Sequence, residues 1–93
     1  MVVGVLQIEL SIPSANSLKA KRQVLHSLKD RIRRHFNVSV AEVGENDLWR
    51  SAVLAVVVAS NDKRFANRIL SKVVDFIGDS HDIVVDDYQL GII

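Results

Sequence analysis

The chain has 93 residues, of which 48% are hydrophobic and 25% are charged, and its formal net charge is +1. This length allows one domain, residues 1–93. The hydrophobic share is enough for a packed core and excludes a disordered tail, and the low net charge excludes a strongly basic whole-protein surface. The absence of cysteine excludes disulfides, CxxC-type zinc sites, iron–sulfur clusters and thiol catalysis.

Two further features of the sequence concern its location. The first residues, Met-Val-Val-Gly, lack the basic region of a secretion signal. The longest apolar run, 52–59, is far shorter than the about 20 residues needed to cross a bilayer. We therefore expect a cytoplasmic protein that makes no contact with a membrane.

The first third of the chain predicts a strand followed by a helix. Apolar residues alternate over 2–12, which is the period of a strand with one buried face, and Pro13 ends this strand. Ser17 is a suitable N-cap for a helix that runs to about residue 35, where apolar residues recur at helical spacing. These residues are Leu18, Leu25, Leu28 and Ile32, with Val24 beside them.

The remainder predicts two strands, a second helix and a last strand. The strands are expected over 37–43, 49–59 and 82–90, and the helix over 63–77. A turn cluster at 44–47 separates the strands expected over 37–43 and 49–59. Gly78 is expected as the C′ residue of the second helix. The residues of this helix expected to face inward are Phe65, Ile69, Val73, Phe76 and Ile77.

This order predicts an α+β domain of the ferredoxin-like βαββαβ kind, with an antiparallel four-stranded sheet and two helices on one face. The other face of the sheet then has no helix to cover it. Apolar residues expected on that face are Val3, Val5, Val53, Ala55 and Val57. Because a contiguous apolar patch often marks an interface, a homodimer is one expectation.

Charge is concentrated on the first helix. Seven of the twelve Lys and Arg residues lie between positions 17 and 35, where Asp30 is the only acid. Five residues follow the spacing i, i+3, i+7, i+10, i+14 and so form one stripe beside the apolar stripe. They are Lys19, Arg22, His26, Lys29 and Arg33. The candidate residues for binding nucleic acid or another anion are Lys19, Lys21, Arg22, His26, Lys29, Arg33 and Arg34.

This stripe has several possible interpretations. It is either a solvated helix face, a contact for RNA or the ribosome, or a contact for another acidic partner. A small anionic ligand at the N-terminal end of the helix is a further alternative. Lys21 projects near the apolar stripe, and we expect it to be an edge residue whose ammonium group reaches solvent.

Catalytic motifs are missing. The three histidines, His26, His35 and His81, do not have metal-ligand spacing, and the glycines do not form a phosphate-binding loop. We expect no catalytic residue, no metal and no cofactor, and hence a protein that is not an enzyme. The aromatic residues Trp49 and Tyr88 lack the motifs of an RNA-stacking sheet, so we expect them to pack in the core or at its rim.

Three segments resemble a known family. They are Ser-Leu-Lys-Ala-Lys-Arg at 17–22, Phe-Asn-Val-Ser-Val-Ala-Glu-Val at 36–43 and Asp-Leu-Trp at 47–49. With these segments the chain resembles the YlxP-like family of small bacterial proteins, a domain of unknown function with ferredoxin-like folds. The family signature falls on Ser17, Leu18, Lys19, Lys21, Arg22 and Glu42.

The resemblance implies a role near translation, because genes of this family often lie beside those for translation initiation and ribosome-binding factor A. Ribosomal RNA or the small ribosomal subunit is therefore an expected partner. Glu42 is expected either to pair with Lys21 or Arg22 or to help form a site. The sequence thus favours a non-enzymatic RNA- or ribosome-associated factor, with a homo-oligomeric interaction module or a small anionic-ligand domain as alternatives.

Overall fold

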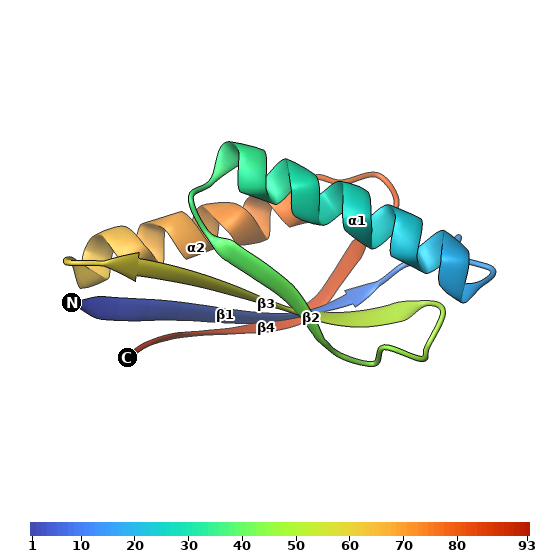
Figure 1. Cartoon of the computed structure of the whole chain (residues 1–93), viewed down its shortest axis with the longest axis horizontal. Coiled ribbons are helices and arrows are strands. Elements are labelled where there is room, and N and C mark those ends of the chain that lie inside the picture. The colour runs from blue at the N-terminus through green and yellow to red at the C-terminus, as the bar shows by residue number, and fades with distance from the viewer.

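The computed structural model describes all of residues 1–93 and contains four strands and two helices. Their order along the chain is β1 (Val2–Ser11), α1 (Leu18–His35), β2 (Ser39–Gly44), β3 (Ser51–Ser60), α2 (Lys63–Gly78) and β4 (Val84–Ile92). The strands form one antiparallel sheet in the order β2-β3-β1-β4, and both helices lie on one side of it (Figure 1). The predicted ferredoxin-like βαββαβ fold is confirmed.

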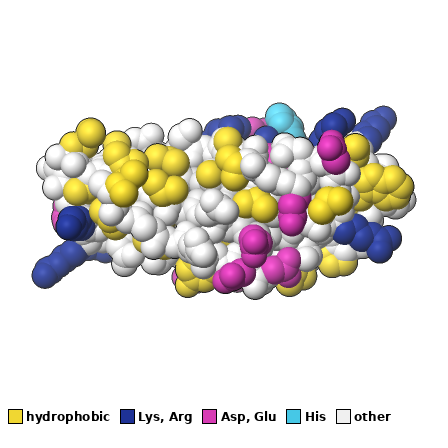
Figure 2. Space-filling model, turned by 90° about the horizontal axis from the view of Figure 1, so that it is seen from below, with side chains coloured by type: hydrophobic (Ala, Val, Ile, Leu, Met, Phe, Trp, Pro, Cys, Tyr) yellow, Lys and Arg dark blue, Asp and Glu magenta, His cyan; other side chains and the backbone are white.

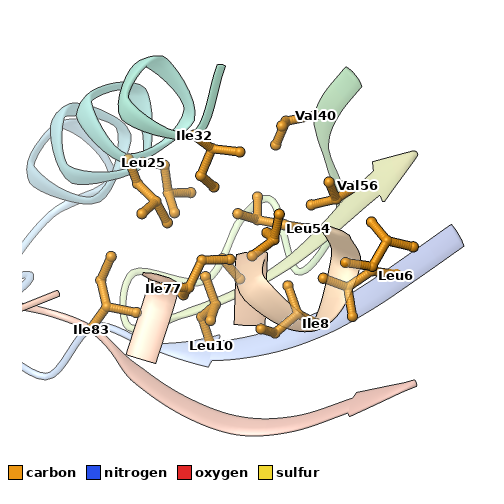
Figure 3. Close-up of a cluster of buried hydrophobic side chains, with 14 of the residues drawn as sticks. Leu6, Ile8, Leu10, Leu25, Ile32, Val40, Leu54, Val56, Ile77 and Ile83 are labelled. Carbon is orange, nitrogen blue, oxygen red and sulfur yellow. The ribbon is translucent and has the colours of Figure 1, made fainter. Parts of the chain in front are cut away.

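The alternation in β1 places one face of the sheet in the core. Leu6, Ile8 and Leu10 are at most 1% exposed, whereas Gln7 and Glu9 on the opposite face are exposed. Both helices cover the apolar face, and side chains from α1, α2 and the sheet meet in one cluster (Figure 3). Each fully buried Leu or Ile in this cluster stabilises the fold by about 1.5–3 kcal/mol.

Helix α1 begins and ends close to its predicted bounds. The Oγ atom of Ser17 accepts a hydrogen bond from the backbone N–H of Ala20 at 3.0 Å, which confirms Ser17 as the N-cap. Leu25, Leu28 and Ile32 are buried as predicted. The apolar seam of α1 therefore fixes which of its other side chains face solvent.

Helix α2 differs from prediction in two details. Phe65 is 44% exposed, so its predicted inward position is wrong. The buried seam is Ala66, Leu70, Val73 and Ile77, and Phe65 precedes it by one residue, which turns its side chain about 100° away from the core. Gly78 is not a left-handed C′ residue, because the helix continues through it and Asp79 is the C-cap with φ −83°.

The connection from β2 to β3 is longer than the sequence predicts. β3 begins at Ser51, so Trp49 belongs to the connecting turn instead of the strand. Within this turn Glu45 has a φ of 57°, in the left-handed region that non-glycine residues rarely adopt. The turn lies directly below the N-terminal end of α1 (Figure 1).

Neither helix of the structure has the length and apolar character that a membrane-spanning helix needs.

Candidate nucleic-acid interface

The basic stripe of α1 lines an open hollow beside the edge strand β2. We call the residues Lys19, Arg22, His26, Lys29 and Arg33 the α1 ridge. The hollow has a volume of about 490 Å³, and its lining includes the first four ridge residues together with Gln23, Leu25 and Glu42. At about 1.5 Å of rise per residue, the ridge is about 21 Å long.

Part of the ridge is neutralised by Asp30. His26 Nε2 lies 3.5 Å from this carboxylate and Arg33 Nη1 lies 3.9 Å from it. Arg33 Nη2 also donates to the backbone carbonyl of Val40 at 3.0 Å, which ties that guanidinium to β2. Lys19, Arg22 and Lys29 form no ion pair, and the first turn of α1 contains no acidic residue. Lys19, Arg22 and Lys29 therefore present positive charge that no ion pair compensates.

Lys21 does not belong to this surface. It is 1% exposed, so the prediction that its ammonium reaches solvent is wrong. Nζ donates to the carbonyl oxygens of Glu45 and Leu48, both at 2.7 Å, and lies 3.1 Å from Glu42 Oε2. These three oxygens replace the water that the ammonium loses. Lys21 is consequently removed from the candidate anion-binding residues.

Glu42 completes this internal contact. Its side chain is 17% exposed, and Oε2 is buried. This oxygen lies close to Lys21 Nζ, but the contact does not have the alignment of a hydrogen bond, and the oxygen has no hydrogen-bond partner. Its charge is thus balanced by the ion pair alone, and the predicted pairing of Glu42 with Lys21 is confirmed.

Two further basic residues of α1 lie outside the hollow, the candidate Arg34 and Arg31, which is not among the predicted site residues. Arg34 is exposed but does not line it. Arg31 lines a second open hollow of about 510 Å³ on another side of α1, together with residues 80–83. That hollow includes Asp82 and no part of the ridge, so it does not extend the basic surface.

Three exposed apolar side chains at and near the β2–β3 connection are absent from the sequence-based prediction. Val43, Leu48 and Trp49 are 52%, 51% and 53% exposed, although all three are large apolar side chains. The sequence predicts that Trp49 and Tyr88 pack in the core or at its rim, but they are 53% and 49% exposed and neither belongs to the core cluster. The sequence signal for Trp49 is its position two residues after the turn cluster 44–47.

The open face of the sheet has a different character from the ridge. Val5 pairs with Val57 across β1 and β3, which gives this face an apolar part. Glu9 pairs with Asp87 across β1 and β4, so two like charges face each other. Figure 2 shows this face with a group of acidic side chains on one part of it and Lys and Arg side chains at its ends. The sheet face is thus apolar in part and acidic in part.

Comparison with known proteins identifies the family of this chain. Residues 3–90 match the family described as "Protein of unknown function (DUF503)". The chain belongs to this family. An uncharacterized Bacillus subtilis protein, YlxP, is 33% identical over 76 residues, which cover 82% of this chain and 83% of the relative. The resemblance to the YlxP-like family is thereby confirmed.

Two solved structures share the fold of this DUF503 domain. The designed protein Foldit4 has a TM-score of 0.54 and 12% identity, with 98% of this chain and 96% of the other covered. A designed protein with ferredoxin fold, LFR1 1, also has a TM-score of 0.54, with 10% identity and coverage of 100% of this chain and 84% of the other. At these identities the likeness shows the fold alone.

Proposed function

We propose that this protein is a non-enzymatic, cytoplasmic RNA-associated factor that binds RNA phosphates on the α1 ridge. The proposal rests on one observation: Lys19, Arg22 and Lys29 line one hollow along one helix face and have no ion-pair partner. Lys and Arg in this arrangement supply charge-assisted hydrogen bonds to phosphate oxygens. Ribosomal RNA or the small ribosomal subunit is the partner that we propose for this surface.

The distribution of acid favours the ridge over the sheet as the RNA-binding surface. Many RNA-binding domains of this topology stack bases on aromatic residues of the open sheet. Here that face contains the Glu9–Asp87 pair, whose charges repel phosphate. Although the net charge is only +1, positive charge is concentrated on helix α1 and part of the open sheet face is acidic.

Salt dependence tests this proposal. We expect the affinity for a fluorescently labelled single-stranded RNA, measured by anisotropy, to fall about 20-fold when salt rises from about 50 to about 200 mM. This figure assumes three phosphate contacts and a log–log slope of about −0.7 for each of them. An RNA affinity that does not change with salt, or no binding at low salt, would contradict the proposal.

A second candidate function is that of a homo-oligomeric interaction module. The apolar part of the open sheet face favours it, because Val3, Val5, Ala55 and Val57 are only partly buried there and lie next to one another in the β1–β3 register. A second copy of the chain packed on these residues would cover them. Sedimentation velocity at about 100 μM should then show a dimer, and Val5→Lys should shift it to monomer. A monomer at that concentration would rule out the homo-oligomeric interaction module.

A further inference from the structure

The connecting turn between β2 and β3, which lies below the N-terminal end of α1 in Figure 1, contains the chain's single tryptophan. Trp49 is 53% exposed, an unusual position for the largest apolar side chain in the sequence. Its neighbour Leu48 is 51% exposed, so neither of these large apolar side chains packs into the core of the chain. An exposed indole offers a flat face on which a nucleic-acid base can stack.

The turn is held in place by hydrogen bonds on both sides of Trp49. On one side, Lys21 Nζ donates to the carbonyl of Leu48. On the other, the carbonyl of Arg50 accepts from the backbone N–H of Ile12 at 2.8 Å, and Arg50 Nε donates to the carbonyl of Ala15 at 3.1 Å. The backbone that presents the indole is thus fixed before any partner arrives, which lowers the entropy cost of binding.

The same contacts place the turn close to the hollow. Lys21 Nζ binds the carbonyl of Leu48 and also pairs with Glu42, which lines the hollow together with Lys19 and Arg22. Arg50 follows Trp49 in the chain and is also exposed. Cations beside an exposed aromatic ring are the combination used to bind single-stranded nucleic acid, in which phosphates contact the cations and a base stacks on the ring.

We propose that the ligand of the α1 ridge is single-stranded RNA and that one unpaired base stacks on Trp49. This inference rests on the proposed function, because the phosphates of the same strand occupy the ridge. A duplex does not satisfy the site, because its bases are already stacked and paired. The protein therefore prefers single-stranded RNA over a duplex of the same length.

Intrinsic fluorescence reports the stacking directly, because the chain has one tryptophan. A 12-nucleotide oligouridine should quench Trp49 emission in a saturable manner, and an RNA duplex of equal length should quench it far less. In parallel, anisotropy with the same labelled oligonucleotide should show that Trp49→Ala weakens binding by about 5- to 150-fold. Trp49→Phe keeps an aromatic ring and should lose much less affinity.

Leu48→Ala is the matched control, since Leu48 is as exposed as Trp49 and lies in the same turn. It should leave RNA affinity within about twofold, and circular dichroism checks that each variant folds. If Leu48→Ala and Trp49→Ala weaken binding equally, or if Trp49→Ala has no effect while the ridge still binds RNA, the stacking proposal is wrong and the proposed function stands. If the wild type binds no RNA, both are wrong.

Discussion

Reversing three charges of the α1 ridge should weaken RNA binding about 100-fold. The variant is Lys19→Glu, Arg22→Glu and Lys29→Glu, which replaces the three cations that have no ion-pair partner. Each lost charge-assisted contact contributes about 1 kcal/mol or more, and each new carboxylate adds repulsion of phosphate. Anisotropy with labelled single-stranded RNA at about 50 mM salt measures the change. Arg33 is left unchanged because it also binds the carbonyl of Val40.

Helix α2 provides the control for this variant. Arg64, Arg68 and Lys72 are exposed, follow one another at i, i+4, i+8 and form no ion pair. Reversing these three to Glu changes the net charge by the same amount as the ridge variant. If charge acts only through the net field of the protein, the two variants should lose affinity equally. Equal loss would mean that the ridge is not a binding surface but a solvated helix face.

Replacing Lys21 should produce the largest loss of stability among single changes on α1. Lys21→Met keeps the length of the side chain but removes the ammonium, which leaves the carboxylate of Glu42 and two turn carbonyls without their partner. Removing one member of a buried ion pair costs about 3–5 kcal/mol, and we expect about 3 kcal/mol because Glu42 keeps some solvent contact. Since a domain of this size has a free energy of unfolding of about 5–15 kcal/mol, the effect is large.

Urea denaturation followed by circular dichroism measures the loss. Lys19→Met makes the same substitution two residues away at an exposed position and should change the free energy of unfolding by less than about 0.5 kcal/mol. The double variant Lys21→Met with Glu42→Gln should regain part of the loss, because no unpaired charge remains. A Lys21→Met variant as stable as Lys19→Met would show that the internal contact contributes little.

The sequence predicts most of the fold because local patterns determine it. Alternation in β1 and the helical spacing of Leu25, Leu28 and Ile32 are direct consequences of the periods of strand and helix. The position of Ser17 before an apolar helical run likewise predicts the N-cap that the structure contains. The order of these elements then leaves few possible topologies.

The sequence does not predict the burial of the Lys21 ammonium group, because its partners are distant in sequence. Lys21 lies three residues after Leu18 and four before Leu25, which is a position on the apolar seam. Its charge suggested an edge position, and no local pattern reveals acceptor carbonyls 24 and 27 residues further along the chain. A lysine on an apolar helical seam is therefore a signal for an internal partner.

The position of Trp49 differs from the prediction for a related reason. The apolar run of β3 extends toward Trp49 in the sequence, so the local pattern predicts a strand that starts at residue 49. In the structure the carbonyls on either side of Trp49 are taken by Lys21 and Ile12, which keeps this residue in the turn. The position of Trp49 in the turn follows from these tertiary contacts, which the local sequence does not encode.

The central claim is that RNA contacts α1 and the adjoining turn and leaves the sheet free, and NMR chemical-shift mapping tests it most directly. Single-stranded RNA is titrated into ¹⁵N-labelled protein, and the backbone amide signals of this 10.4 kDa chain are followed. We expect saturable shifts concentrated at residues 17–30 and 45–50. Shifts concentrated on the open faces of β1 and β3, or on α2, would contradict it, as would the absence of any shift at low salt.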